Sequence, residues 1–181
     1  MSDGPSILLE SARTYLARGY AVIPVPARKK IPVLKGWTDL RLSETDLPAH
    51  FNGTGNIGVL LGEPSGWLVD VDLDCEEAVA LAPKFLPPTG ATSGRPGKPA
   101  SHWWYICEGI KTRKHQDPVS KKMIVELRST GAQTVVGPSI HPSGEPYDPL
   151  DGEPAVVDAG ELAAAVAALA DAVTEARHGR K

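Results

Sequence analysis

Residues 67–74 read WLVDVDLD and place three carboxylates at alternate positions of an otherwise apolar run. Val, Leu and Trp favour a β-strand, in which successive side chains point to opposite faces of the sheet. A strand here would therefore gather Asp70, Asp72 and Asp74 on one face and the apolar side chains on the other. The rise of ~3.3 Å per residue puts the Cα atoms of Asp70 and Asp72 about 7 Å apart.

Two anions this close repel each other, and one of them takes up a proton unless a cation neutralises the pair. A hard divalent cation with oxygen ligands removes the repulsion, so the pattern predicts a Mg²⁺ or Mn²⁺ site. A strand whose exposed face happens to be acidic would show the same pattern. Asp70 and Asp72 alone do not separate these two interpretations.

Glu126 lies in the stretch MIVELR (residues 123–128) and is another acid inside an apolar strand pattern. If that strand lies beside the first one, Glu126 completes a cluster of three carboxylates that can hold two metal ions. Such two-metal sites serve phosphoryl transfer. Asp74 directly precedes CEEAVALAPKF (residues 75–85), which reads as a helix, so we expect Asp74 to cap that helix.

Basic residues concentrate in the middle of the chain, although the net charge of the whole is −3. Residues 91–130 carry a net charge of +5, and residues 148–181 carry −4. A basic segment in an acidic chain indicates either a site for a polyanion, such as a nucleotide or nucleic acid, or a solvated charged face. The stretch GRPGKPAS (residues 94–101) is not a P-loop, because Pro99 stands where Ser or Thr should follow the Gly-Lys pair.

Several residues of this region are candidates for binding a nucleotide. His102 follows the glycine-rich loop and could donate a hydrogen bond to a phosphate, together with Arg95 and Lys98. It could equally be a half-buried histidine of a strand. Ser139 and His141, in GPSIHPSG, could contact the sugar or phosphates, or merely form a turn.

The remaining pattern predicts an α+β protein with a mixed or antiparallel sheet and flanking helices. Helices are expected at residues 6–19, 75–85 and 159–176, and strands at 21–25, 56–62, 66–73, 102–107, 123–127 and 133–137. Residues 89–101 and 111–122 read as loops because they are rich in Gly, Pro, Ser and charged residues. Aromatic residues 103–105 could stack on a base or, more simply, belong to the core.

Composition excludes several classes of protein. The 181 residues are 41% hydrophobic, which suits one compact soluble domain. The chain has no apolar run of membrane-spanning length, and its first ten residues lack the pattern of a signal peptide, so we expect a cytoplasmic protein with no membrane partner. Cys75 and Cys107 are too few for a disulfide framework or a zinc site; we expect two reduced thiols and no zinc.

Taken together, the motifs resemble the N-terminal primase-polymerase (prim-pol) domain of phage and plasmid replication proteins, in the archaeo-eukaryotic primase superfamily. The family's apolar-Asp-apolar-Asp motif is matched by residues 69–72, its small-x-His motif by residues 100–102 and its apolar-acid motif by residues 125–126. The flanks YLARGYAVIPV, KIPVLKGW, GNIGVLLG and VVGPSIHPSG occur in the family's usual order. The resemblance covers residues 11–147.

The resemblance implies a two-layer α+β fold with an RRM-like sheet and a metal-dependent nucleotidyltransferase, acting as DNA primase, DNA polymerase or both. Asp70, Asp72 and Glu126 would hold two Mg²⁺ or Mn²⁺ ions, and His102 would bind the triphosphate of an NTP or dNTP. Beyond the residues that match the family's motifs, we expect Arg128, with Lys98 or Arg95, to assist His102. The other substrate would be a single-stranded DNA template.

The resemblance also bears on what surrounds the catalytic unit. We expect a catalytic domain over residues 1–155 and a C-terminal helix and tail over residues 156–181, leading to a further domain in a longer natural protein. Many relatives continue into a helicase domain, so a helicase domain or protein is a candidate partner. The chain departs from the family in having Glu126 where Asp is also common, and in lacking the Cys and His residues for the zinc-binding insertion of some relatives.

Two other functions remain compatible with the residues. One is a phosphatase of the haloacid dehalogenase type, in which an Asp-x-Asp also follows an apolar strand. Asp74 stands where that family usually has Thr or Val, and regular βαβ alternation is lacking, which both argue against it. The other is a non-catalytic nucleic-acid-binding module of a replication protein, in which the acids would be structural.

Overall fold

The computed structural model describes residues 6–180 and shows two β-sheets with helices packed on both. Two predictions fall partly outside this range. The expected absence of a signal peptide involves residues 1–5, and the expected C-terminal tail includes residue 181. The helices are α1 (Ile7–Ala17), α2 (Leu47–His50), α3 (Glu76–Phe85) and α4 (Ala159–His178). The strands are β1 (Val22–Val25), β2 (Asn56–Leu60), β3 (Leu68–Leu73), β4 (Thr92–Arg95), β5 (Lys98–Ile106), β6 (Arg113–Gln116), β7 (Met123–Arg128), β8 (Gln133–Val136) and β9 (Ala155–Val156).

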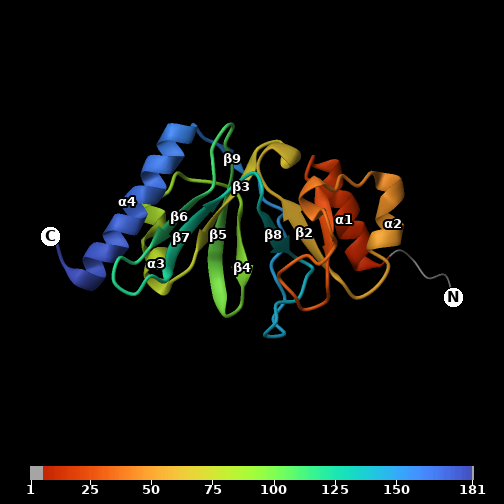
Figure 1. The fold of residues 1–181 in the computed structure, drawn as a ribbon, viewed down its shortest axis with the longest axis horizontal. Helices are drawn as coiled ribbons and strands as arrows, with labels where there is room; N and C mark the ends of the chain where they lie inside the picture. The colour runs from red at the N-terminus through yellow and green to blue at the C-terminus, as the bar shows by residue number, and fades with distance from the viewer. Residues whose placement is uncertain (1–5, 181) are drawn as a thin grey trace.

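The larger sheet has the strand order β4-β5-β3-β7-β6, with β9 added in parallel to β5. The smaller sheet has the order β1-β2-β8. Neighbouring strands on these two paths are antiparallel. Figure 1 shows α3 and α4 beside the larger sheet at one end of the molecule and α1 and α2 beside the smaller sheet at the other. The predicted α+β class is confirmed.

Strand β3 lies at the centre of the larger sheet, and its two faces differ as its sequence predicts. Val69, Val71 and Leu73 are fully buried and pack in one core with α3 and α4. From α4, that core receives Leu162, Val166 and Leu169 among others. The apolar face of β3 therefore holds the helical layer, and the acidic face is left for the other side of the sheet.

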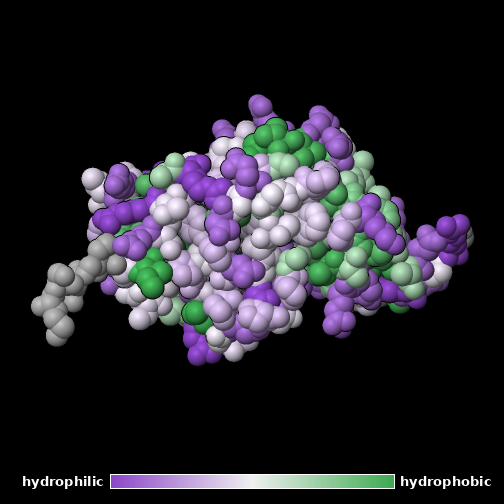
Figure 2. Space-filling model, turned by 180° about the vertical axis from the view of Figure 1, so that it is seen from behind, coloured by the Kyte–Doolittle hydropathy of each residue, from purple (hydrophilic) through white to green (hydrophobic). Residues whose placement is uncertain are grey.

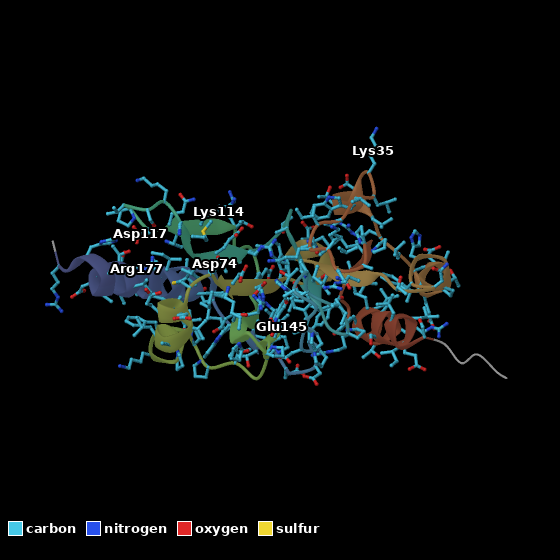
Figure 3. All side chains as sticks on the ribbon, turned by 90° about the horizontal axis from the view of Figure 1, so that it is seen from below. Lys35, Asp74, Lys114, Asp117, Glu145 and Arg177 are labelled. Atoms are coloured by element: carbon cyan, nitrogen blue, oxygen red, sulfur yellow. The ribbon has the colours of Figure 1, made fainter. Side chains whose placement is uncertain are left out.

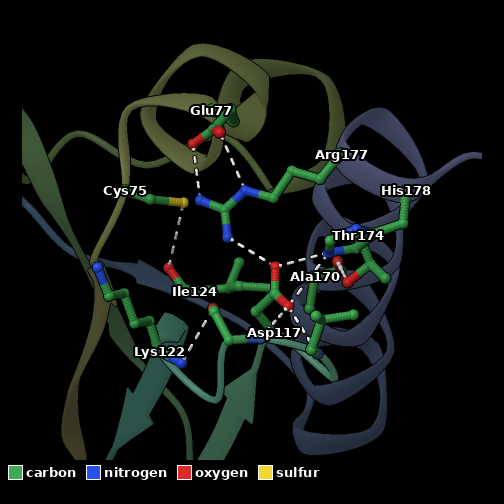
Figure 4. Close-up of polar contacts among 11 residues, drawn as sticks. Cys75, Glu77, Asp117, Lys122, Ile124, Ala170, Thr174, Arg177 and His178 are labelled. Carbon is green, nitrogen blue, oxygen red and sulfur yellow. Dashed lines mark hydrogen bonds and ion pairs between the residues drawn. The ribbon is translucent and has the colours of Figure 1, made fainter.

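The end of α4 is fixed by charged groups rather than by apolar packing (Figure 4). The Arg177 guanidinium donates two hydrogen bonds to Glu77 and a third to Asp117, each 3.0 Å long. His178 lies 3.0 Å from Asp117 on the same side. Hydrogen bonds from the backbone of the 117–120 turn and from His178 hold the pKa of Asp117 well below its usual value, and the Arg177 hydrogen bond lowers the pKa of Glu77 to about 2.

Two segments expected as loops form strands instead. Residues 92–106 make the hairpin β4–β5, in which a Cβ on Gly94 would lie 2.4 Å from the carbonyl oxygen of Lys98. The glycine therefore permits close strand pairing rather than marking a loop. Residues 113–116 form the edge strand β6, whose charged side chains are typical of sheet edges. The short helix α2 was also not expected.

The prediction that Asp74 caps α3 is wrong. The residue at the N-cap is Cys75, and its side chain makes no capping hydrogen bond. The cap of α1 is as predicted: the Ser6 hydroxyl accepts a hydrogen bond from the Leu9 amide at 3.2 Å.

The surface of the molecule is mainly polar on the face drawn in Figure 2, with hydrophobic patches toward the end that holds α4. Within residues 6–180, no helix combines the length and the apolar character needed to cross a membrane.

Candidate active site

The pairing of the strands aligns the predicted site residues across the larger sheet. Asp72 lies directly opposite His102 of β5 on one side and Glu126 of β7 on the other. Directly opposite residues of antiparallel strands project from the same face. The expectation that the Glu126 strand lies beside the first acidic strand is therefore confirmed. One cross-sheet row runs through Ser93, His102, Asp72, Glu126 and Lys114.

A cavity of about 410 Å³ lies over this face of the larger sheet, and residues of the smaller sheet's β8 form part of its wall. Seven of the nine predicted site residues line it: Asp72, Glu126, His102, Arg128, Lys98, Arg95 and His141. Asp70 and Ser139 do not. Further lining residues include Lys30, Ile31, Asp74, Gln133, Thr134 and Tyr147.

Asp70 is fully buried beside the cavity and joins the two sheets. Its carboxylate lies 2.9 and 3.1 Å from His102 Nδ1 and accepts a hydrogen bond of 2.8 Å from the Thr134 hydroxyl of β8. That hydroxyl in turn accepts a hydrogen bond of 3.1 Å from Arg128 Nη1. Asp70 thus fixes His102, while Thr134 links Asp70 to Arg128.

The acids around His102 favour its protonated form. Burial by itself lowers the pKa of His102, but the charges of Asp70 and Asp72 and the hydrogen bond to Asp70 outweigh it, so the pKa is raised. A carboxylate beside Nδ1 keeps a proton on that nitrogen. The ring is therefore suited to interact with an anion in the cavity.

Asp74 is a third carboxylate at the cavity rather than a helix cap. Partial desolvation, followed by the charges of Asp72 and Glu126, raises the pKa of Asp74 to about 6, against the opposing charges of Lys98 and His102. Asp74 is therefore partly desolvated at the cavity and lies near two other acids.

The donor set fits a hard divalent cation. Within residues 6–180, no three His, Cys, Asp or Glu side chains stand close enough together to enclose a metal ion as they lie. Mg²⁺, however, is usually held by one or two carboxylates together with waters and substrate phosphates, not by a complete protein cage. Asp72, Asp74 and Glu126 present carboxylates to one cavity, and the charges of the other two add to burial in raising the pKa of Asp74.

Cationic side chains line other parts of the same cavity. Arg95 pairs with Glu145 at 2.5 Å, and Glu145 also accepts a hydrogen bond from the Gly97 amide. Figure 3 places Glu145 in the central part of the molecule. Arg128 has a buried Nε without a hydrogen-bond partner and lies 3.7 Å from Glu126. With Lys98, these side chains give the cavity positive charge near its carboxylates.

Residues 137–147 contain two predicted site residues, of which His141 lines the cavity and Ser139 does not. His141 lines the cavity, and its Nδ1 accepts a hydrogen bond of 3.0 Å from the Ser143 amide. Burial and the nearby charges of Arg95 and Lys30 lower the pKa of His141. Ser139 is buried, and its hydroxyl accepts a hydrogen bond of 2.8 Å from the Ile57 amide, so it supports the smaller sheet.

The aromatic residues of β5 belong mainly to the core. Trp104 and Tyr105 are fully buried. Trp104 Nε1 donates to the Ser93 hydroxyl at 2.8 Å, and the Tyr105 hydroxyl donates to the Pro87 carbonyl at 2.7 Å. Trp103 is half-buried. It lies opposite Val71 and packs against the core on the helical side of the sheet, so none of the three aromatic residues lines the cavity.

Sequence reasoning missed several residues that the fold brings to the cavity. Gln133 and Thr134 begin a strand that continues as Val-Val, and polar side chains in such a strand were a usable signal. Lys30 lies in a loop far from the acids in sequence, so only the fold reveals it. Lys114 does not line the cavity but lies opposite Glu126 on the edge strand, and the loop assignment of residues 111–122 hid this pairing.

The family model for the N-terminal domain of bifunctional DNA primase/polymerases, Prim-Pol, matches residues 12–169. The chain belongs to this family. It is accordingly an enzyme domain of the primase/polymerase type, and the resemblance drawn from its motifs is confirmed. No curated protein matches the chain. The antiparallel neighbours of β3 also lack the parallel βαβ arrangement of the rival phosphatase fold.

Proposed function

We propose that this Prim-Pol domain is a metal-dependent nucleotidyltransferase that extends a strand on a single-stranded DNA template. The observation that supports this most directly is the alignment of Asp72 between His102 and Glu126 at a cavity that also holds basic side chains. Carboxylates suit divalent cations, and the adjacent cations suit a triphosphate.

In the proposed reaction, the 3′-hydroxyl oxygen of the growing strand forms a bond to the α-phosphorus of an NTP or dNTP. The bond from that phosphorus to the bridging oxygen of the β-phosphate breaks, pyrophosphate leaves, and the hydroxyl proton passes to solvent. Two bound Mg²⁺ or Mn²⁺ ions would supply charge stabilisation at the attacking and the leaving oxygens.

Asp72 and Glu126 would hold the ions because both line the cavity. Asp70 would join them by exchanging one of its hydrogen bonds, with His102 or Thr134, for a metal contact. Asp74 stands beside these groups and adds negative charge.

The chain's cations would bind and orient the triphosphate. His102, held at Nδ1 by Asp70, would contact a phosphate oxygen. Lys98 and Arg128 would add charge, and Arg95 would do so from its ion pair with Glu145. His141 lies in the same cavity and would contact the sugar or a phosphate; Ser139 would act only by supporting β2.

The wider setting follows from the family resemblance. We infer a role in phage or plasmid DNA replication in the cytoplasm, with a helicase domain or protein as partner. Residues 1–155 would form the catalytic unit and residues 156–181 the connection to a further domain. In the structure, α4 packs on the larger sheet, so this connecting helix is also part of the catalytic core.

The test is template-dependent extension of a labelled primer with Mg²⁺ or Mn²⁺ and either NTPs or dNTPs. Asp72→Asn and Glu126→Gln keep the size of each side chain but weaken it as a metal ligand. We expect each to reduce incorporation by at least ~100-fold, the scale of losing a major electrostatic group at a reacting centre. Glu108→Gln, an exposed acid in the turn after β5, is the matched control and should retain activity.

The same protein preparations separate the rival functions. Hydrolysis of phosphate monoesters without primer extension would favour the phosphatase. Binding of oligonucleotides with neither activity would favour the binding module. Extension that survives Asp72→Asn would contradict the metal site proposed here.

A further inference from the structure

Residues 28–35, with the sequence RKKIPVLK, form an exposed loop (the 28–35 loop) between β1 and the turn Trp37–Asp39. Its middle reaches the cavity, because Lys30 and Ile31 line it. Its far end leads away from the cavity: Figure 3 shows Lys35 projecting from the body of the molecule. The loop therefore connects the candidate active site with the surface.

The 28–35 loop is strongly basic. It contains Arg28, Lys29, Lys30 and Lys35 and no acidic residue. All four are exposed, and no ion pair within residues 6–180 involves them. Four cations that form no ion pair in the described part of the chain, at the edge of a site proposed to bind nucleotides, favour a polyanion as ligand.

The same loop exposes apolar side chains. Ile31, Val33 and Leu34 are 73%, 79% and 40% exposed, and they make up three of the six large hydrophobic residues exposed within the described range. Pro32, between the first two, is buried and anchors the segment. Apolar side chains gathered at the surface in this way mark a place where another molecule binds.

Buried amide side chains hold the backbone of the loop in place. Asn56 Nδ2 donates to the Lys29 carbonyl at 3.0 Å, and Gln133 Nε2 donates to the Lys30 carbonyl at 2.8 Å. Asn56 also bonds to the backbone of Ile140, so it ties the loop to the residue next to His141, which lines the cavity. The backbone is thus positioned in advance, which lowers the entropy lost when a ligand binds the side chains.

We propose that the 28–35 loop binds single-stranded nucleic acid at the entrance of the cavity, with its basic side chains on phosphates and its apolar side chains against bases. The inference rests on the proposed function, which requires a single strand to reach this cavity. Proteins that bind single strands combine a positively charged groove with side chains against the base faces, usually aromatic ones; in this loop the exposed aliphatic side chains would take that place. An anionic membrane attracts similar loops, but the continuity with the cavity through Lys30 and Ile31 favours nucleic acid.

The test is fluorescence anisotropy with a labelled oligothymidylate of about 20 nucleotides, without nucleotide or divalent cation. In Lys29→Ala/Lys35→Ala, loss of two phosphate contacts reduces the slope of log K against log salt by about 1.4, which at 0.1 M salt is a roughly 25-fold loss of affinity. Lys84→Ala/Lys111→Ala removes the same charge from exposed positions elsewhere and should keep the wild-type slope.

The apolar contribution is measured with Val33→Ser/Leu34→Ser. Affinity should fall while the salt slope stays unchanged, because no charge is removed. Val119→Ser/Val156→Ser, at positions that are 72% and 83% exposed, is the matched control. All the substituted side chains are on the surface, so each variant should keep the wild-type urea unfolding midpoint, which checks that a loss of binding does not come from unfolding.

The inference is overturned if the unaltered protein does not bind the oligonucleotide or if the two loop variants bind like their controls. It is also overturned if the loop variants lose binding only to vesicles containing phosphatidylserine. These outcomes are independent of catalysis. Weakened binding by the loop variants of a protein that never extends a primer would refute the proposed function and leave the loop assignment standing.

Discussion

Replacing Thr134 by valine tests the hydrogen bonds that join the two sheets at the site. The Thr134 hydroxyl donates to Asp70 at 2.8 Å and accepts from Arg128 at 3.1 Å. Valine has nearly the same shape, so Thr134→Val removes the hydroxyl without leaving a large cavity. Asp70 is fully buried and cannot replace the lost donor with bulk water.

The magnitude follows from the two bonds. A hydrogen bond to a buried charge contributes about 2 kcal/mol. Arg128 is 22% exposed at its side chain and can turn to water, so its bond adds little. We therefore expect the free energy of unfolding to fall by about 2 kcal/mol, and Tm to fall by about 4–8 °C for a chain of this size.

Urea denaturation followed by circular dichroism measures the change, and nucleotide affinity measures its effect on the site. Without the hydroxyl, the side chains of Asp70 and Arg128 lose a partner that holds them in place, so the Kd for nucleotide should rise. Thr134→Ser restores the hydroxyl and should recover most of both quantities, whereas Thr92→Val, at an exposed position of β4, should change neither. A loss below about 0.5 kcal/mol, the usual range for surface changes, would refute the view that this hydroxyl joins the sheets.

Three further predictions concern stability. Gly62 has φ +75°, and an added Cβ would lie 2.3 Å from the Thr130 amide nitrogen, so Gly62→Ala should cost about 3 kcal/mol in denaturant unfolding; a change near zero would contradict the tight approach. The buried Tyr15 hydroxyl donates to the Gly137 carbonyl at 2.5 Å and accepts from the Leu150 amide, so Tyr15→Phe should cost about 2 kcal/mol, measured the same way; an unchanged midpoint would contradict the two bonds. Because the pKa of Asp117 is lowered on folding, its stabilisation is present above the unfolded value of about 3.9 and is lost as pH falls below it. The difference in unfolding free energy between wild type and Asp117→Asn should therefore shrink from pH 5 to pH 2.5, and a constant difference would exclude this linkage.

The sequence predicts the elements that are long or strongly patterned. The alternation of acids and valines in residues 67–74 correctly predicts which side of β3 packs in the core. Ser6 correctly marks the start of α1, and the Ala-rich stretch correctly predicts α4. In each case the local pattern agrees with the tertiary environment, which is why local reasoning suffices.

The errors come from residues whose role depends on which strands pair and on what the fold brings beside them. Gly94 reads as a loop residue until Lys98 of the next strand lies against it. Asp74 has the properties of a helix cap, but it lies at the cavity with Asp72 and Glu126. Strand pairing, not local propensity, decides both cases, and a single sequence does not reveal pairing.

For the candidate site, the acids and His102 could be predicted because they follow a recognisable order. The cluster with Glu126 requires β7 to lie beside β3, and the structure meets this condition. The sequence does not show that the Ser139 hydroxyl accepts a hydrogen bond from the Ile57 amide. Its structural role in place of a ligand contact could therefore not be predicted. Thr134 was missed because it comes from β8 of the smaller sheet, and Lys30 because it comes from the 28–35 loop after β1. The position of both segments at the cavity is a property of the whole fold.

The link between Asp70 and Thr134 also has a consequence for how the enzyme matures. These residues are 64 positions apart in sequence, and Asp70 and His102 are 32 apart. Contacts between such distant segments form late, since the loop-closure entropy must be overcome before they contribute. During synthesis, a chain that has emerged only as far as β7 can pair its acidic strands but lacks the Thr134 hydroxyl. Such a nascent chain can therefore hold its carboxylates in register and place His102 beside Asp70, but the hydroxyl that links Asp70 to Arg128 arrives only with β8.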